Sequence, residues 1–226
     1  MPNNEKESLD FLGHKYKLAL NFEDSKKFDK AEAVYNEILQ VNPNDSKVLL
    51  GRAVARLVKN KMFEGLTDLS RAYQISDIEG KIRAALVYEE IGNFKEAYIC
   101  FGEIINLAPD NYRANVNLAR LDLYHDKKEE AKSRLSNLLE KDSTQPEAYL
   151  QLANVYLTEN KVNEALPLLE KSLEISPDNI YVLYTVTLAH LENDNLEVAQ
   201  KYLDHALSLE PTNPTLLDLK AELSKN

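Results

Sequence analysis

Residues 78–111 read IEGKIRAALVYEEIGNFKEAYICFGEIINLAPDN. The stretch holds two apolar segments with helical spacing, separated by a polar turn and closed by a proline. Its marker residues are Ala85, Tyr88, Gly92, Asn93, Phe94, Ala97, Phe101, Ala108, Pro109, Asp110 and Asn111. A small residue in each segment lets two helix backbones approach closely, and a nearby large residue fills the groove between them. The stretch therefore predicts a helix, a turn and a second helix.

The same pattern recurs along the chain at a nearly constant step. Small residues separated by 34, 32, 34, 34 and 34 residues stand at Ala31, Gly65, Ala97, Ala131, Ala165 and Ala199. A second series, always twelve residues earlier, contains Ala19, Ala53, Ala85, Ala119, Ala153 and Thr187. Prolines follow the first series by twelve residues at Pro43, Pro109, Pro177 and Pro211, where a fixed φ and a missing amide end a helix. A fixed period of this length predicts a stack of helical repeats.

A 34-residue helix-turn-helix unit with these markers resembles the tetratricopeptide repeat. The resemblance implies an all-α, right-handed superhelical α-solenoid of six helix-turn-helix units plus a C-terminal capping helix. The expected repeats span residues 12–45, 46–77, 78–111, 112–145, 146–179 and 180–213. Residues 1–11 are expected to lead into the first helix, and residues 214–226 to form a solvating helix that completes the array.

Two repeats depart from the pattern. The second has Gly65 for Ala and Asp77 for Pro and is two residues short, which predicts a tighter turn at 76–78 and a local change of pitch. The sixth has Thr187 for Ala and His190 for Tyr, which predicts its least regular inner contact. In the capping helix, the apolar side is expected to carry Leu216, Leu219 and Leu223, and the polar side Asp218, Glu222 and Lys225.

Composition and charge exclude several classes of function. The net charge is −10 and the basic residues are scattered, so no basic stripe is available for a nucleic-acid backbone. No segment is long and apolar enough to cross a membrane, and residues 1–10 lack the features of a secretory signal. A cytoplasmic protein is the simplest expectation, although an exported domain without its signal would have the same sequence.

The chain offers no constellation typical of catalysis. His14, His125, His190 and His205 lie in different repeats without a carboxylate or cysteine partner at ligand spacing, and Cys100 is expected to be a buried structural thiol. No glycine-rich phosphate loop is present. The sequence therefore predicts a protein that is not an enzyme and needs no cofactor or metal.

The resemblance implies a concave groove lined by the first helix of each repeat. The predicted groove residues are Lys17, Lys47, Leu50, Ile82, Arg83, Arg113, Val116, Asn117, Arg120, Leu150, Asn154 and Tyr184. Five cations and two carboxylates, Glu79 and Glu147, occupy groove positions, which gives +3 within an acidic chain. The predicted partner is a protein segment or helix with aliphatic and acidic side chains, held mainly by repeats two to four.

Other interpretations remain open at this point. Leu50, Ile82 and their apolar neighbours Val54 and Leu86 could simply pack adjacent first helices together, and the arginines could only balance nearby acids. The chain could instead build a homo-oligomer through repeat surfaces, for which Tyr181 and Tyr184 are candidates. The carboxylate clamp that holds Hsp70 and Hsp90 tails in this family needs Lys at position 5 of its first repeat. Because no repeat here has Lys at that position, that partner class is disfavoured.

Overall fold

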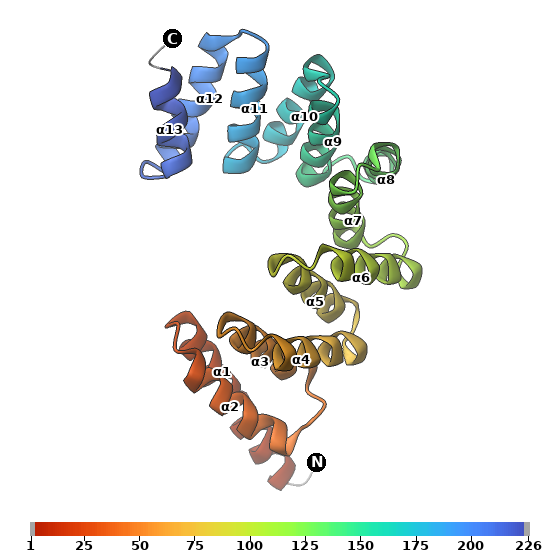
Figure 1. Cartoon of the computed structure of the whole chain (residues 1–226), viewed down its shortest axis with the longest axis vertical. Helices are drawn as coiled ribbons and strands as arrows, with labels where there is room; N and C mark the ends of the chain where they lie inside the picture. The colour runs from red at the N-terminus through yellow and green to blue at the C-terminus, as the bar shows by residue number, and fades with distance from the viewer. Residues whose placement is uncertain (1–2, 224–226) are drawn as a thin grey trace. The chain divides into compact units, whose positions relative to one another are not determined.

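Most of the chain that the structure describes is helical. The computed structural model describes the backbone of residues 3–223 and the side chains of residues 11–223. Within these limits it contains thirteen α-helices and no β-strand (Figure 1). The predicted all-α class is confirmed.

The helices belong to two compact units, Met1–Ala114 and Asn115–Asn226. The first contains α1 (Asn3–Asp24), α2 (Phe28–Val41), α3 (Ser46–Val58), α4 (Met62–Ile75), α5 (Ile78–Glu90) and α6 (Phe94–Leu107). The boundary falls within α7 (Tyr112–Tyr124). The second unit continues with α8 (Lys128–Lys141), α9 (Pro146–Thr158), α10 (Val162–Ile175), α11 (Ile180–Glu192), α12 (Leu196–Leu209) and α13 (Pro214–Leu223). Because α1 begins at Asn3, the segment expected to lead into the first helix is itself largely helical.

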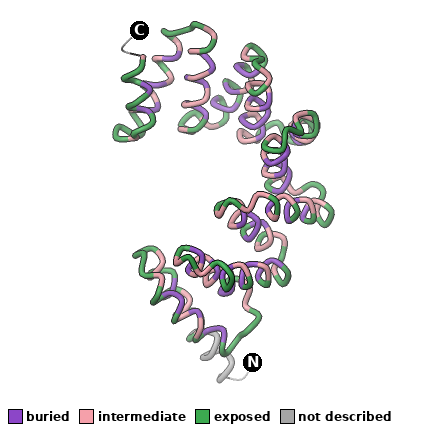
Figure 2. Tube along the Cα trace, viewed as in Figure 1, coloured by how far each residue is buried: buried purple, intermediate pink, exposed green. Residues whose placement is uncertain are grey.

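Within each unit, consecutive helices pack against each other, from α1 to α6 in the first unit and from α8 to α13 in the second. The small residues predicted to allow this approach, Ala31, Ala97, Ala131, Ala165 and Ala199, are all 0% exposed. Buried residues follow the inner sides of the hairpins in both units (Figure 2). The core of each unit is therefore a row of helix-helix contacts in which each pair buries the apolar stripe of its neighbour.

The turn inside every hairpin uses one residue in the left-handed region. These residues have φ between 55° and 79° and are Lys26, Asn60, Gly92, Asp126, Asn160 and Asp194. They recur at the same step as the small residues. Only the third repeat places a glycine there, the residue that adopts this conformation without steric cost.

The second repeat is shortened at the connection from α4 to α5. Two residues, Ser76 and Asp77, join these helices, whereas four residues join α2 to α3 and α6 to the following helix. The predicted tighter turn is confirmed. The same repeat packs unusually closely at Gly65, where an added Cβ would lie 2.7 Å from Leu57 Cγ and 3.3 Å from the carbonyl oxygen of Ala53.

A network of charged side chains joins α2, α3 and α4 inside the first unit. Asp68 accepts hydrogen bonds from Arg52 Nε at 2.7 Å and Nη2 at 2.8 Å, and from Arg56 Nη1 at 2.8 Å. Glu32 accepts from Arg56, Lys59 and Lys61 at 2.9, 3.0 and 2.9 Å. Asp68 is only 5% exposed and Glu32 only 8%. We call Glu32, Arg52, Arg56, Lys59, Lys61 and Asp68 the ion network.

The sixth repeat buries its two irregular residues in α11. The Thr187 hydroxyl donates to the carbonyl oxygen of Leu183 at 2.7 Å, which satisfies it within its own helix. The His190 ring stacks on Tyr202 of α12 with 5.6 Å between centroids. Both ring nitrogens of His190 are buried and have no hydrogen-bond partner among the residues that the structure describes. The irregular inner contact predicted for the sixth repeat is thus located at His190, whose imidazole nitrogens are buried without hydrogen bonds in the described part of the chain.

His190→Phe is expected to reduce the acid sensitivity of the second unit. Burial lowers the pKa of His190 below its ordinary value, and the carboxylate of Glu170 opposes this only in part. His190 therefore binds a proton more readily in the unfolded chain than in the folded chain. The free energy of unfolding falls as the pH drops below the ordinary histidine pKa. Melting temperatures by circular dichroism at pH 7 and pH 5 should show a larger drop for the wild-type protein. Equal drops would contradict this account.

The last helix has the polarity predicted for a cap. Asn213 accepts hydrogen bonds from the amides of Thr215 and Leu216 at 3.0 and 3.3 Å, which fixes the start of α13. Leu216 and Leu219 are buried, and Leu223 packs against the core of the second unit. Asp218 and Glu222 are exposed, and Lys225 lies outside the described residues. None of the described helices is both long enough and apolar enough to cross a membrane.

Candidate partner-binding groove

The first helices of the first three repeats form one side of the first unit. Helix α3 contacts both α1 and α5. The starts of α3 and α5 are fixed by aspartate caps: Asp45 accepts from the amides of Lys47 and Val48 at 3.1 and 3.2 Å, and Asp77 accepts from the amide of Gly80 at 2.8 Å. These caps set the beginning of each helix, and thereby the position of the side chains along it.

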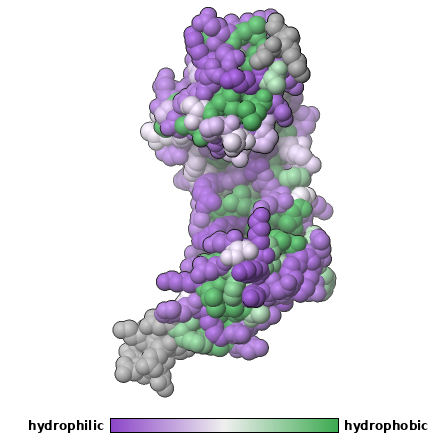
Figure 3. Space-filling model, turned by 90° about the vertical axis from the view of Figure 1, so that its left-hand side faces the viewer, coloured by the Kyte–Doolittle hydropathy of each residue, from purple (hydrophilic) through white to green (hydrophobic). Residues whose placement is uncertain are grey.

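A concave pocket of about 310 Å³ lies across α1, α3 and α5. We call it the central pocket; its lining residues are Tyr16, Leu20, Glu23, Lys47, Leu50, Gly51, Val54, Arg83, Leu86 and Val87. Most of its walls are aliphatic. The face of the first unit seen in Figure 3 carries hydrophobic surface framed by hydrophilic residues.

Two smaller pockets continue the central pocket in opposite directions. One, of about 110 Å³, shares Lys47, Leu50 and Arg83 with it and lies at the N-terminal ends of α3 and α5. The other, of about 230 Å³, shares Val54 and Val87 and lies towards the C-terminal ends of the same helices. Together the three pockets form a groove that runs along α3 and α5.

Two cations stand where the central pocket meets the N-terminal one. The ammonium group of Lys47 is exposed and has no hydrogen bond or ion pair within the described residues. Arg83 Nε lies 3.7 Å from Glu79, with both side chains about half exposed, which is a weak surface pair. Glu79 also pairs with Arg113. Positive charge therefore remains available at Lys47 and Arg83.

The structure brings together some of the predicted groove residues of the first unit. Lys47, Leu50 and Arg83 line the central pocket. Lys17 is exposed on α1, and Arg113 is half exposed and engaged with Glu79.

Three predicted groove residues are in the core instead. Ile82 is 0% exposed, and Val116 and Leu150 are each 5% exposed. Side chains this deeply buried offer almost no surface to a ligand, so the structure does not support them as groove residues. For Ile82, the burial favours the alternative that it packs adjacent helices together.

The predicted residues of the second unit are partly used within the protein. Arg120 Nη2 donates to Asn117 Oδ1 at 2.9 Å, and both side chains are half-buried. Asn154 is half-buried on α9, and Tyr184 packs against the core of the second unit. The charged and apolar features predicted for a groove are therefore combined most clearly in the first unit.

The central pocket also contains residues that the sequence did not single out, among them Glu23 and Gly51. Glu23 lies on the same side of α1 as Tyr16 and Leu20, seven and three residues later, so helical spacing could have indicated it. Gly51 sits in the middle of α3, where a glycine is unfavourable without a close neighbour. Burial raises the pKa of Glu23 and also that of Tyr16, whose pKa the Glu23 charge raises further.

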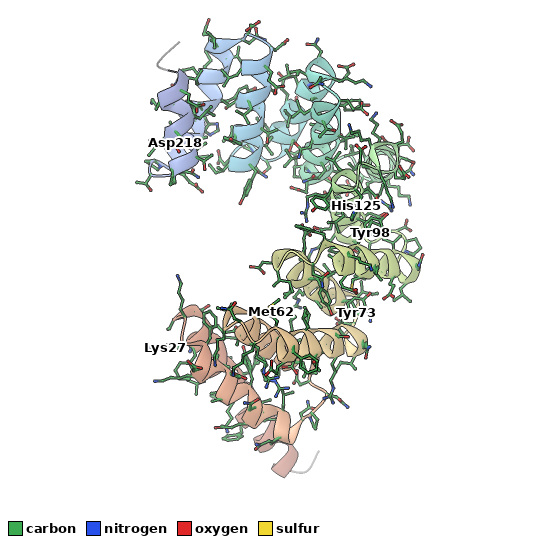
Figure 4. The ribbon with its side chains drawn as sticks, viewed as in Figure 1. Lys27, Met62, Tyr73, Tyr98, His125 and Asp218 are labelled. Atoms are coloured by element: carbon green, nitrogen blue, oxygen red, sulfur yellow. The ribbon has the colours of Figure 1, made fainter. Side chains whose placement is uncertain are left out.

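The only cysteine is a buried, protonated thiol. Cys100 is 5% exposed, and burial raises its pKa to about 12. Tyr73 lies near the end of α4 (Figure 4), and its hydroxyl is within hydrogen-bond distance of two acceptors, the Cys100 carbonyl oxygen at 3.0 Å and Glu103 Oε2 at 2.9 Å. The thiol is free and buried, as its position in the sequence predicted. Among the described residues, no three His, Cys, Asp or Glu side chains are grouped to hold a metal ion.

Comparison with family models links these hairpins to known repeats. Models described as "Tetratricopeptide repeat" match residues 16–77 and 116–180, residues 78–111, and residues 156–223. The first of these models alone matches more than half of the chain.

Curated relatives match over part of their own length. The mouse "Interferon-induced protein with tetratricopeptide repeats 2" is 36% identical over 83 residues, which cover 36% of this chain and 18% of that protein. The bovine "BBSome complex member BBS4" is 21% identical over 189 residues, which cover 82% of this chain and 36% of that protein. The chain thus spans about a third or less of these relatives.

Solved structures show the same fold. A tetratricopeptide repeat protein from Parabacteroides merdae is similar with a TM-score of 0.73 and 14% identity, over 94% of this chain and 85% of that one. YrrB, described as "a TPR protein with an unusual peptide-binding site", has a TM-score of 0.55 and 17% identity, over 76% of this chain and 89% of that one.

Proposed function

The chain belongs to the tetratricopeptide repeat family, and on that premise we propose that it is a non-catalytic adaptor that binds a segment of a partner protein in the groove of its first unit. Proteins of this family generally mediate protein-protein interactions. The peptide-binding site named for YrrB is consistent with a ligand of this kind.

The observation that carries the proposal is the combination of charge and apolar surface in the central pocket. Lys47 and Arg83 flank walls formed by Leu50, Val54 and Leu86, although the chain as a whole is acidic. An aliphatic side chain gains free energy when these walls remove it from water. A carboxylate on the same segment can pair with the two cations. The preferred partner segment therefore combines aliphatic and acidic side chains.

The double substitution Lys47→Glu with Arg83→Glu is expected to weaken peptide binding at least tenfold. Replacing two attractive charges by two repulsive ones removes the complementarity with an acidic segment and adds like-charge repulsion. Peptides would first be selected from a phage-displayed library of random twelve-residue sequences against the wild-type protein. Their affinities would then be measured by fluorescence anisotropy.

A matched control changes the net charge by the same amount away from the groove. Arg71→Glu with Lys95→Glu alters two exposed side chains on the second helices α4 and α6 of the same unit. This control should bind the selected peptides nearly as well as the wild-type protein. Equal weakening by both double variants would show that only the overall charge matters and would contradict the groove.

A second candidate is self-association through the sixth repeat. Tyr181 of α11 is 80% exposed, which is unusual for a large aromatic side chain. The other predicted contact, Tyr184, packs mostly within its own unit. Light scattering at rising protein concentration separates the two candidates, because a monomer throughout would exclude the homo-oligomer.

A further inference from the structure

The groove of the first unit is divided into three steps along α3 and α5. We call the pocket at the starts of these helices the N-terminal pocket and the one towards their ends the C-terminal pocket. The N-terminal pocket meets the central pocket at Leu50 and Arg83, and the central pocket meets the C-terminal one at Val54 and Val87. On both helices these boundaries lie four residues apart, which is about 6 Å of helix rise. The groove therefore presents three binding positions in a row, about 6 Å apart.

The two ends of the row differ in charge. Lys47 and Arg83 line the N-terminal pocket together with Asp77, whose Oδ1 already accepts a hydrogen bond from the amide of Gly80 at 2.8 Å. The only charged residue that lines the C-terminal pocket is Glu90. The carboxylate of a ligand is thus attracted to the first position and repelled from the third.

The second and third positions are apolar. The central pocket has walls formed by Leu50, Val54 and Leu86. In the C-terminal pocket, Val58 is 55% exposed and lies beside Ile91. An apolar side chain that covers Val58 removes both groups from water, which stabilises the complex. The row therefore reads acidic, apolar, apolar from the starts of α3 and α5 to their ends.

The spacing and the helix dipoles both suit an extended ligand. In an extended segment, alternate side chains point to the same side and lie about 6.6 Å apart, close to the step of the row. A helical ligand could match the step with every fourth residue, but its dipole conflicts with the site in either direction. With its N-terminus at the N-terminal pocket, its dipole is parallel to those of α3 and α5. In the reverse direction, its acidic residue lies at its own negative C-terminal end. An extended segment has only a small net dipole and avoids both conflicts.

We propose that the groove recognises an extended five-residue motif with an acidic side chain at one end and apolar side chains two and four residues away. This inference rests on the proposed function and specifies the order and spacing of the partner's side chains. The acidic residue pairs with Lys47 and Arg83, the middle residue fills the central pocket, and the last residue covers Val58. The order holds for either direction of the peptide chain, because side chains alone define it.

The experiment begins with the peptides selected by the wild-type protein from the random twelve-residue phage library. They should share the alternating motif. In one synthetic twin, the acidic residue changes places with the middle apolar one, so composition and charge stay the same but the order is wrong in both chain directions. In a second twin, one added alanine after the acidic residue turns it to the opposite side of the segment. Fluorescence anisotropy should show each twin binding at least tenfold more weakly.

A variant of the C-terminal pocket connects the last motif position to its contact. Replacing that apolar residue of the peptide by serine should weaken binding to the wild-type protein at least fivefold. On Val58→Glu the same replacement should change affinity no more than twofold, because the exposed apolar wall is lost. Val41→Glu is the matched control, since Val41 is 62% exposed at the end of α2 and does not line the groove. This control should keep the fivefold effect. The comparisons of peptides on the wild-type protein do not depend on any variant being folded.

The possible failures are distinguishable. Selected peptides whose acidic and apolar residues lie three or four apart, or twins that bind as well as their parents, would overturn the extended motif. If those peptides are still weakened by Lys47→Glu with Arg83→Glu, the proposed groove stands. No selected peptides, or peptides that bind Lys47→Glu with Arg83→Glu unchanged, would overturn both.

Discussion

Asp68→Ala is expected to lower the free energy of unfolding of the first unit by about 3 kcal/mol. Asp68 is 5% exposed and accepts three hydrogen bonds from Arg52 and Arg56. Removing it leaves Arg52, whose side chain is 16% exposed, without its carboxylate partner, and leaves Arg56, 18% exposed, with Glu32 alone. Loss of one partner from a buried pair costs far more than loss of a surface pair. Urea unfolding followed by circular dichroism measures the change.

Asp29→Ala is the matched control within the same cluster of charges. Asp29 pairs with Lys59, but its side chain is 86% exposed, so its removal should cost less than about 1 kcal/mol. Similar losses for Asp29→Ala and Asp68→Ala would show that the burial of the ion network does not govern its contribution.

The ion network also predicts how the first unit responds to acid. Burial by itself would raise the pKa of Glu32, but hydrogen bonds from Lys61, Arg56 and Lys59 lower it to about 2. A carboxyl whose folded pKa lies below its unfolded value contributes stability that is complete above the unfolded value, near 4.5. That contribution is lost as the pH falls from there towards 2.

Gly65→Ala is expected to destabilise the first unit by about 2 kcal/mol, although alanine is the better helix former. The new Cβ would meet Leu57 Cγ at 2.7 Å, and Leu57 is itself 7% exposed and cannot move freely. This steric overlap would force α3 and α4 to move apart. The same unfolding measurement tests this.

Gly102→Ala separates this packing effect from helix propensity. Gly102 lies inside α6, and an added Cβ there would have no neighbour within 4 Å. The substitution should therefore stabilise the chain by up to about 1 kcal/mol, the ordinary gain of alanine over glycine. Stabilisation by both substitutions would show that the contact at Gly65 is not close-packed.

The helices could be predicted from the sequence because the same helix signals recur in successive repeats. Ala97 and Pro109 mark a buried contact and a helix end in one repeat, and their equivalents do so in others. A small residue or a proline is a weak signal in one repeat, but its recurrence at the same position in other repeats makes the prediction stronger. The buried alanines confirm that the period reports packing and not composition alone.

The groove was harder to predict because it depends on small rotations about a helix axis. Successive residues are about 100° apart around an α-helix, so neighbours such as Ile82 and Arg83 face different surroundings. Ile82 is in the core, whereas Arg83 lines the groove. Family analogy placed both in one surface and could not separate them.

Other features had no signal of their own in the sequence. Gly51 is explained only by Tyr35, which lies sixteen residues earlier on another helix. The ion network likewise joins Glu32 and Asp68 through Arg56, which lies on a third helix. Charged residues in helices are usually solvated, so their burial becomes evident only when the packing of the hairpins is known.

The left-handed turns have a consequence for how the fold could be improved. Five of the six place a side chain where glycine would be relaxed, and Lys26 is the least suited of them. These positions lie one to a hairpin, so relief at one turn should add to relief at the next. Glycine substitutions at these turns should therefore raise the melting temperature of the chain. The turns are spread along its length and do not belong to the surface proposed for recognition.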